Sequence, residues 1–261
     1  MKTLPKQPLL PPQSTALRLG ATGFVIGPLV DSLHNQCLLK YDVAPITLPP
    51  SSPDPLLASS WAVPPLLAFA YVVLGYILPR IIEFLPIPKE NSLEEEDHVM
   101  DGRNNTNELK NKALLAVSST AAIIKLSEVL QTHDFIQIGD GVINMDAGIK
   151  LELMFLADAF QWVILDRTPV ALIAAAVTAF GGPLSELPFV SAGFWNYIPA
   201  AADYTPLAMI QPGSIEGLLT SVLGDNYKTL TLSSITGPCY FAVTLDSIAL
   251  GRYFYSLEES K

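Results

Sequence analysis

The sequence predicts an all-α, polytopic membrane protein built as a bundle of six transmembrane helices. Half of its 261 residues are apolar and only 15% are charged, against roughly 25% in soluble domains. Its mean hydropathy is +0.37, and its 22 prolines suit a polytopic chain better than one soluble α/β domain. Mostly apolar stretches of about 20 residues, enough for a helix to cross a bilayer, recur six times.

The expected spans form one membrane domain, residues 17–252, between short tails at 1–16 and 253–261. In the first span, Gly20, Gly23 and Gly27 are three or four residues apart. That spacing allows close helix contact and equally leaves room for a lipid between helices. The six expected spans are 17–39, 61–85, 113–130, 149–166, 169–190 and 232–252.

The spans differ in the positions of their prolines and in the number of charged residues that they contain. The second opens with Pro64-Pro65, and the sixth has Pro238 near its start; a first helical turn tolerates proline at these places. The second and fifth are cleanly apolar, whereas the first, third, fourth and sixth carry charged residues, with Asp31 in the first. We therefore expect that not every span faces lipid all round.

The connectors have distinct compositions. Loop 41–60 has five prolines among residues 45–55, so it should be extended rather than helical. Loop 86–112 contains an acidic run at 94–97 and should be a solvated cytoplasmic linker. The long connector 190–231 is rich in aromatic residues, which favours a partly interfacial position.

The distribution of Lys and Arg predicts the orientation. Ten of the fifteen basic residues fall on one side: eight in the tails, in loop 86–112 and in the turn 166–168, and two, Arg18 and Arg252, at the span ends next to the tails. Because short cytoplasmic loops carry the excess of positive charge, both termini should be cytoplasmic. The formal net charge of −10 excludes the basic face that a nucleic-acid partner needs.

Besides Asp31 in the first span, five ionisable residues lie at membrane depth, where each is costly: Lys125, Glu128, Glu152, Asp158 and Asp246. Mutual neutralisation between the third and fourth spans is the plainer interpretation. The alternative is a small transporter, or an intramembrane lipid enzyme, that uses Lys125, Glu128, Glu152 and Asp158 as a path for protons or ions.

The sequence predicts no catalytic residue and no metal site. It contains no HExxH, GxSxG, GxGxxG or P-loop pattern, and His34, His98 and His133 are scattered. Cys37 and Cys239 stand alone in or beside apolar runs, which favours small buried hydrophobic side chains. We therefore expect a protein that is not an enzyme and needs no cofactor.

Motifs in matching order resemble the insulin-induced gene (Insig) family between about residues 17 and 252. Residues 59–65, Ser-Ser-Trp-Ala-Val-Pro-Pro, resemble the family's Ser-x-Trp-x-Val-Pro-Pro. Residues 162–168, a Trp followed by Leu-Asp-Arg-Thr, resemble its Trp-x-x-Phe-Asp-Arg-Ser turn. Residues 237–252 resemble its Leu-Pro-Cys-x-Phe-Phe to Gly-Arg ending. Lys125-Leu126 and Tyr204-Thr205 match further short motifs.

The resemblance implies a non-catalytic, multi-pass protein of the endoplasmic reticulum that binds an oxysterol or related lipid among its helices. In the family, the lipid promotes association with a sterol-sensing membrane protein. That partner is the escort Scap of SREBP signalling or hydroxymethylglutaryl-CoA reductase. We therefore expect a regulatory adaptor of sterol or isoprenoid synthesis. The span residues expected to line its lipid cleft are Phe24, Gly27, Phe69, Phe155 and Trp162.

The chain also departs from the family pattern. Pro206-Leu207 follows Tyr204-Thr205 where the family has Ser-Pro-Asp, so the acidic partner-binding residue has no aligned match. Asp203 is the candidate substitute, and the expected partner-binding residues are Asp203, Tyr204 and Thr205. Residues 138–148 resemble an insertion, and the connector 208–233 is long. A divergent member with another lipid-pathway partner, or one in a plastid membrane, would fit these changes.

Overall fold

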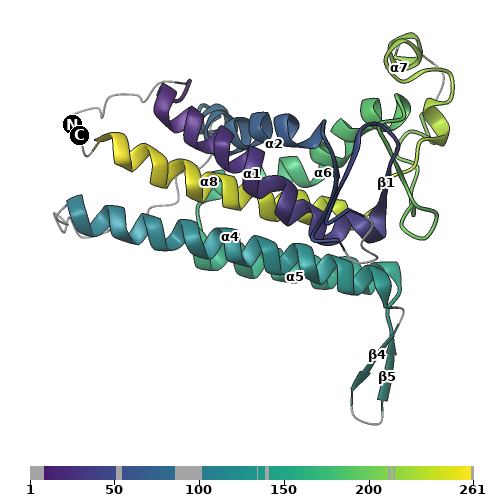
Figure 1. Cartoon of the computed structure of the whole chain (residues 1–261), viewed down its shortest axis with the longest axis horizontal. Coiled ribbons are helices and arrows are strands. Elements are labelled where there is room, and N and C mark those ends of the chain that lie inside the picture. Colours follow the sequence, from purple (N-terminus) through teal and green to yellow (C-terminus); the bar gives the residue numbers. More distant parts are fainter. Residues whose placement is uncertain are drawn as a thin grey trace.

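The computed structural model describes residues 9–50, 55–85, 102–133, 135–138, 141–210, 213 and 215–259. Most of these residues are helical (Figure 1). The helices are α1 (Gln13–Leu38), α2 (Val63–Val72), the π-helix η1 (Val73–Ile77), α3 (Leu78–Glu83), α4 (Gly102–Thr132), α5 (Ala147–Leu165), α6 (Pro169–Ser191), α7 (Glu216–Leu223), the 3₁₀-helix η2 (Tyr227–Thr229) and α8 (Thr236–Glu259).

Each of the six predicted spans coincides with a helical segment. Within the described residues, four segments are long and apolar enough to cross a membrane: Gln13–Leu38, Val63–Glu83, Thr106–Thr132 and Pro169–Ser191. The other two are α5 and α8, which carry buried acidic residues. The bundle extends beyond the expected limits 17 and 252, because α1 starts at Gln13 and α8 continues to Glu259.

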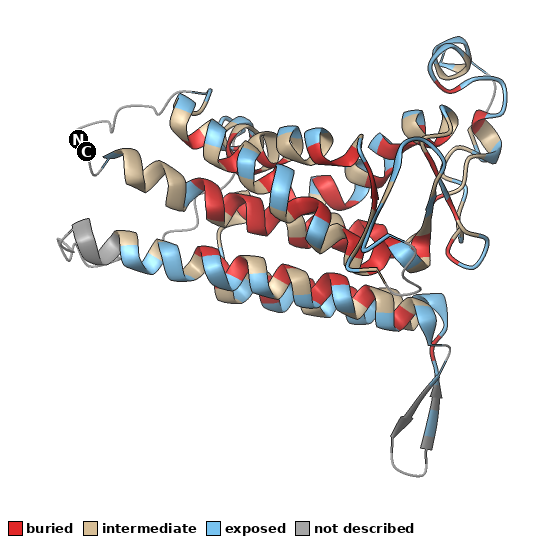
Figure 2. Cartoon of the chain, in the orientation of Figure 1, coloured by how far each residue is buried: buried red, intermediate tan, exposed pale blue. Residues whose placement is uncertain are grey.

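Helix α8 is the centre of the bundle. It contacts α1, α4, α5, α6 and η1, and Figure 2 shows long stretches of it buried. A helix surrounded by protein needs no continuous apolar surface toward lipid, because its polar groups find partners on neighbouring helices. This position explains how α8 tolerates Asp246, Thr244 and Ser247, all of which are buried.

Glycines set the closest helix contacts. A Cβ atom on Gly251 of α8 would lie 2.1 Å from the carbonyl oxygen of Gly75 in η1. A Cβ atom on Gly23 of α1 would lie 2.4 Å from the carbonyl oxygen of Leu67 in α2. The small residues of the first span therefore serve close packing at Gly23. In η1, the Leu78 N–H donates to the Val73 carbonyl, and Pro79 lacks the N–H that an α-helix would direct at Gly75.

The connectors contain three short two-stranded sheets that composition alone did not indicate. Within loop 41–60, β2 (Pro45–Leu48) pairs antiparallel with β3 (Leu57–Ser60), so this loop is extended as predicted. Strand β1 (Leu39–Tyr41), directly after α1, pairs with β6 (Trp195–Tyr197) after α6. Strands β4 (Phe135–Ile138) and β5 (Gly141–Asn144) form a hairpin that overlaps the predicted insertion.

Helix α4 begins at Gly102, inside the stretch 86–112 that the composition predicts to be a loop. Helix-forming residues and an ion pair of Lys112 with Glu108, 3.0 Å apart and one turn away, stabilise this first part of α4. The acidic run at 94–97 lies outside the described residues.

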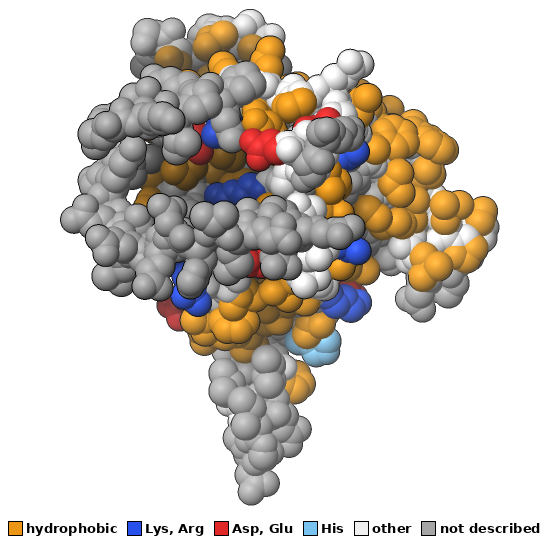
Figure 3. All heavy atoms as spheres, turned by 90° about the vertical axis from the view of Figure 1, so that its left-hand side faces the viewer, with side chains coloured by type: hydrophobic (Ala, Val, Ile, Leu, Met, Phe, Trp, Pro, Cys, Tyr) orange, Lys and Arg blue, Asp and Glu red, His pale blue; other side chains and the backbone are white. Residues whose placement is uncertain are grey.

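Helices α1 and α8 place their outer ends, and with them the two chain termini, at the same end of the bundle (Figure 1). Figure 3 views this end, where basic and acidic side chains lie near one another. Three ion pairs join its elements or stabilise their ends: Arg18–Glu258 at 3.4 Å, Arg80–Glu83 at 2.8 Å, and Arg252–Asp166. The last pair links α8 to the turn between α5 and α6, so two motifs of the family resemblance contact each other.

Candidate functional site: an interhelical cleft

A cleft of about 630 Å³ opens between α1, α2, η1, α6 and α8. Its wall is mostly apolar and includes Leu67, Phe69, Leu74, Val177 and Val243. Its volume falls in the range of roughly 300–1,000 Å³ typical of small-molecule sites. Such a wall suits a largely hydrocarbon molecule.

Two glycines on α6 lie in one wall of the cleft. Gly181 and Gly182 both line it. A Cβ atom on Gly181 would meet no other atom within 4 Å, whereas one on Gly182 would lie 2.4 Å from the ring of Tyr240. Gly182 therefore lets Tyr240 pack against α6, and Gly181 leaves open space.

One polar group of the cleft is centred on Glu186 of α6. Its carboxylate accepts hydrogen bonds from the Tyr197 hydroxyl at 2.6 Å, the Tyr240 hydroxyl at 2.9 Å and the Trp195 indole N–H at 3.3 Å. Tyr197 and Trp195 reach Glu186 because β6 is anchored to the end of α1 through β1. Three donors satisfy this buried carboxylate, and all three aromatic residues line the cleft.

A second polar group lies on α1, where Asp31, His34 and Asn35 line the same cleft. The Asn35 side-chain amide donates to Asp31, and it also lies 2.6 Å from the hydroxyl oxygen of Tyr41. His34 Nδ1 lies 2.9 Å from Ser127 Oγ on α4. The cleft is therefore apolar along the helices and polar near the ends of α1 and α6.

Two of the five predicted lipid-binding residues, Gly27 and Phe69, line the cleft. Phe24 lies on an exposed part of α1, at 48% exposure. Phe155 and Trp162 belong to α5, which packs on α4 and α8 rather than beside the cleft. The indole of Trp162 instead donates to the Thr168 carbonyl at 3.1 Å and so closes the turn into α6. These three residues are not part of the cleft wall. They were predicted to line it because sequence spacing does not reveal which helix faces meet.

The predicted intramembrane charges are dispersed. Lys125 and Glu128 form an ion pair along one face of α4, but Glu152 is exposed on α5. Asp158 is buried, and no described group donates a hydrogen bond to it. Asp246 accepts from the Tyr71 hydroxyl at 2.9 Å. The structure therefore joins only one pair of the four residues on which the transporter or enzyme alternative depended.

The predicted partner-binding segment lies before α8. The Asp203 carboxylate accepts from the backbone N–H of Ser234 at 2.7 Å and from its hydroxyl, so it ties this segment to the start of α8. Tyr204 forms an isolated bridge with Leu232, and burial raises the pKa of its phenol to about 12. Thr205 is exposed. Asp203 thus has a structural role that the sequence did not indicate.

Sequence reasoning missed the polar groups of the cleft. Glu186 lies inside the fifth predicted span, so an acidic residue at membrane depth was the available signal. Asp31 was noted as a charge in the first span, but not as part of a site with His34. The donors to Glu186, Tyr197 and Tyr240, come from distant elements, and nothing in the sequence links them to it. Among the described residues, no three His, Cys, Asp or Glu side chains gather in a way that could hold a metal ion.

No family model and no curated protein matches this chain. Two crystal structures do match its fold: a mycobacterial Insig homolog, MvINS from Mycobacterium vanbaalenii, and a cross-linked MvINS trimer. Each has a TM-score of 0.55 and 16% sequence identity, over 94% of this chain and 96% of the other. The chain has an Insig-like fold. This fold agrees with the motif resemblance.

Proposed function

We propose that this protein is a non-enzymatic regulatory adaptor that crosses the membrane six times and binds one sterol or related lipid in the interhelical cleft. The cleft carries the proposal, because it combines a volume of about 630 Å³ and an apolar wall with hydrogen-bonding groups near one end. A lipid with a hydrocarbon body and one hydroxyl or carbonyl matches that division. The Insig-like fold supports the same class of function.

Lipid binding acts on a partner through the shape of the bundle. The cleft lies between helices, so an occupant sets how α1, α2 and α6 are positioned around α8. A membrane partner that prefers the occupied arrangement binds more tightly when lipid is present. The proposed partner is a Scap-like escort or hydroxymethylglutaryl-CoA reductase, which contacts the segment Asp203 to Thr205. Co-purification with and without sterol measures this coupling.

The proposed location is the endoplasmic-reticulum membrane, with both termini in the cytoplasm; a plastid membrane is the competing location. Basic residues concentrated toward the end that holds the termini support this orientation. Co-localisation of a tagged full-length chain with markers of the two organelles distinguishes them.

The lipid site is tested by photo-crosslinking a clickable oxysterol to the purified protein, with unlabelled sterol and diacylglycerol as competitors. Gly181→Leu places a side chain where a Cβ atom has open space, so it should fill the cleft without disturbing the fold. We expect it to weaken saturable labelling by about tenfold, equivalent to roughly 1.4 kcal/mol.

Gly217→Leu is the matched control. Gly217 also lies in a helix, α7, where an added Cβ atom would meet no other atom within 4 Å, and it does not line the cleft. The substitution should leave labelling unchanged. Equal labelling of the two variants, or labelling that no lipid displaces, would remove the cleft as the lipid site.

A further inference from the structure

A thiol and an imidazole from distant parts of the chain meet in the wall of the cleft. Cys239 Sγ on α8 lies 3.6 Å from His34 Nδ1 on α1. The two residues are 5% and 4% exposed, and both line the cleft. Nothing in the proposed adaptor function uses this pair.

Asp31 orients the imidazole. Its Oδ1 lies 3.5 Å from His34 Nε2, and the Asn35 amide holds the carboxylate in place. Because a carboxylate accepts hydrogen bonds, it favours the tautomer with the proton on Nε2. The lone pair of Nδ1 then faces the thiol. A nucleophile, a base and a group that orients the base are the components of an activated cysteine.

Cys239 also lies at the helix end that suits a nucleophile. It is the fourth residue of a helix that begins at Thr236, so it lies in the first turn, and the dipole of a helix is positive at that end. Cys37, the other cysteine, lacks this setting, since it lies near the end of α1 and its thiol donates to the His34 carbonyl at 3.0 Å.

The hydroxyl of Ser127 also contacts His34 Nδ1, at 2.9 Å. Ser127 is fully buried and does not line the cleft. Its hydroxyl has one proton: it donates this proton to Nδ1 while the imidazole is neutral, and it donates to the Ile124 carbonyl, 2.7 Å away, once Nδ1 holds the thiol proton. The thiol is therefore the nucleophile that a molecule in the cleft can reach.

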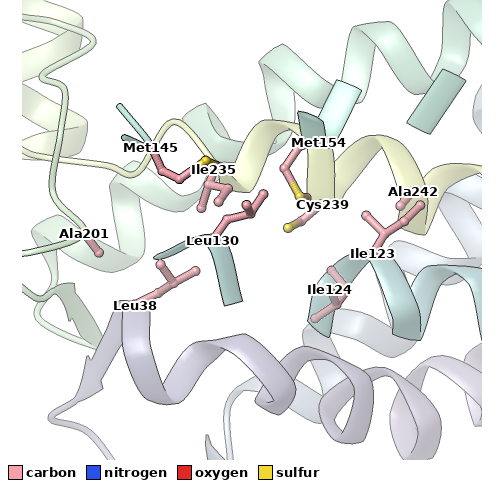
Figure 4. Close-up of a cluster of buried hydrophobic side chains, with 10 residues drawn as sticks. All are labelled: Leu38, Ile123, Ile124, Leu130, Met145, Met154, Ala201, Ile235, Cys239 and Ala242. Atoms are coloured by element: carbon pink, nitrogen blue, oxygen red, sulfur yellow. The ribbon is translucent and has the colours of Figure 1, made fainter. Parts of the chain in front are cut away.

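The surroundings of Cys239 are apolar. Figure 4 shows it among the side chains of Ile124, Leu130 and Met154. Water is a poor competitor in such a setting, so the thiol is the nucleophile that an electrophile there meets. A soft thiol in an apolar, lipid-sized cleft matches a soft carbon electrophile on a hydrocarbon chain.

We propose that Cys239 forms a covalent adduct with an α,β-unsaturated carbonyl lipid in the cleft, with His34 as general base and Asp31 as a positioning residue. This inference rests on the proposed lipid occupancy of the cleft. His34 Nδ1 takes the thiol proton, and the sulfur forms a bond to the β-carbon. The π electron pair of the C=C bond moves to the α-carbon, which receives the proton from His34. No oxidant, leaving group or water is required.

The experiment treats the purified full-length protein with an alkyne-tagged hexadecenal whose double bond is conjugated with the aldehyde. Intact mass and peptide mapping then follow adduct formation at each cysteine. We expect one adduct per chain, at Cys239, formed faster than at the more exposed Cys37. Cys37→Ser should keep it, and Cys239→Ser should abolish it.

The base and the positioning residue need separate variants. His34→Gln should slow adduct formation about a hundredfold, whereas Ser127→Ala, which removes the competing partner of Nδ1, should not slow it. Asp31→Asn should lower the rate of adduct formation at a saturating concentration of the unsaturated aldehyde, a readout that does not depend on how tightly the aldehyde binds. Asp31→Glu should restore part of the rate.

Preferential labelling of Cys37, or an equal rate in wild type and a folded His34→Gln variant, would overturn the proposal. The comparison of the two cysteines within wild type stands even where a variant fails to fold. Displacement of the clickable oxysterol by hexadecanal, the saturated aldehyde, reports lipid binding separately. Binding without an adduct refutes the reactive thiol alone, and absence of both refutes the lipid site as well.

Discussion

Glu186 is the residue that holds the polar end of the cleft together. Its carboxylate serves three donors, from Trp195, Tyr197 and Tyr240, on two other elements. Without an acceptor, each donor would be a buried polar group with no partner, at a cost of about 1–3 kcal/mol. One side chain therefore positions β6 and α8 relative to α6.

We predict that Glu186→Leu lowers the free energy of unfolding by about 1 kcal/mol or more for each donor that loses its acceptor. Glu186→Gln, which keeps an acceptor oxygen, should lower the free energy of unfolding less. Thermal unfolding in detergent measures both. Glu152→Leu, on the exposed face of α5, is the control and should change the melting temperature little. Equal melting temperatures for the three variants would refute this role of Glu186.

At the scale of elements, the contact of η1 with α8 depends on two glycines. The backbones of Gly75 and Gly251 approach so closely that a Cβ atom on Gly251 would overlap the Gly75 carbonyl. Because the atom in the way is backbone, no side-chain rotation relieves the overlap. The two helices would have to move apart.

Gly251→Ala should therefore destabilise the fold by at least about 1–3 kcal/mol, the usual cost of overpacking. Gly217→Ala, in open space on α7, should be neutral or slightly stabilising because alanine favours helix. The melting temperatures of the purified variants test this difference. A stable Gly251→Ala variant would mean that η1 and α8 do not pack as described.

At the scale of the whole molecule, the bundle has two chemically different ends. The end with both termini carries the ion pairs Arg18–Glu258 and Arg252–Asp166. The opposite end carries the β1–β6 sheet, α7 and the polar part of the cleft (Figure 1). An even number of crossings follows if all six long helical segments span the membrane.

We predict that tags at both termini are cleaved by protease added outside sealed endoplasmic-reticulum vesicles, and that a tag inserted at Gly217 in α7 is protected. Detergent should expose all three tags and so controls for tag accessibility. Protection of only one terminus would show an odd number of crossings and refute the six-span topology.

The sequence by itself determined the long helices and their approximate limits, because apolar length and proline placement are local properties of the chain. It also indicated the extended loop 41–60 and the close-packing glycine Gly23. Of the five residues it predicted for a lipid site, Gly27 and Phe69 line the interhelical cleft, and lipid binding there stays a prediction.

Only the tertiary structure decided which helix faces meet. It placed Phe155 and Trp162 away from the cleft, gave Asp203 a contact with Ser234, and brought Cys239 to His34 across 205 residues of sequence. Such contacts depend on how helices pack around α8. In a bundle where every helix is apolar, periodicity does not distinguish a lipid-facing side from a protein-facing one.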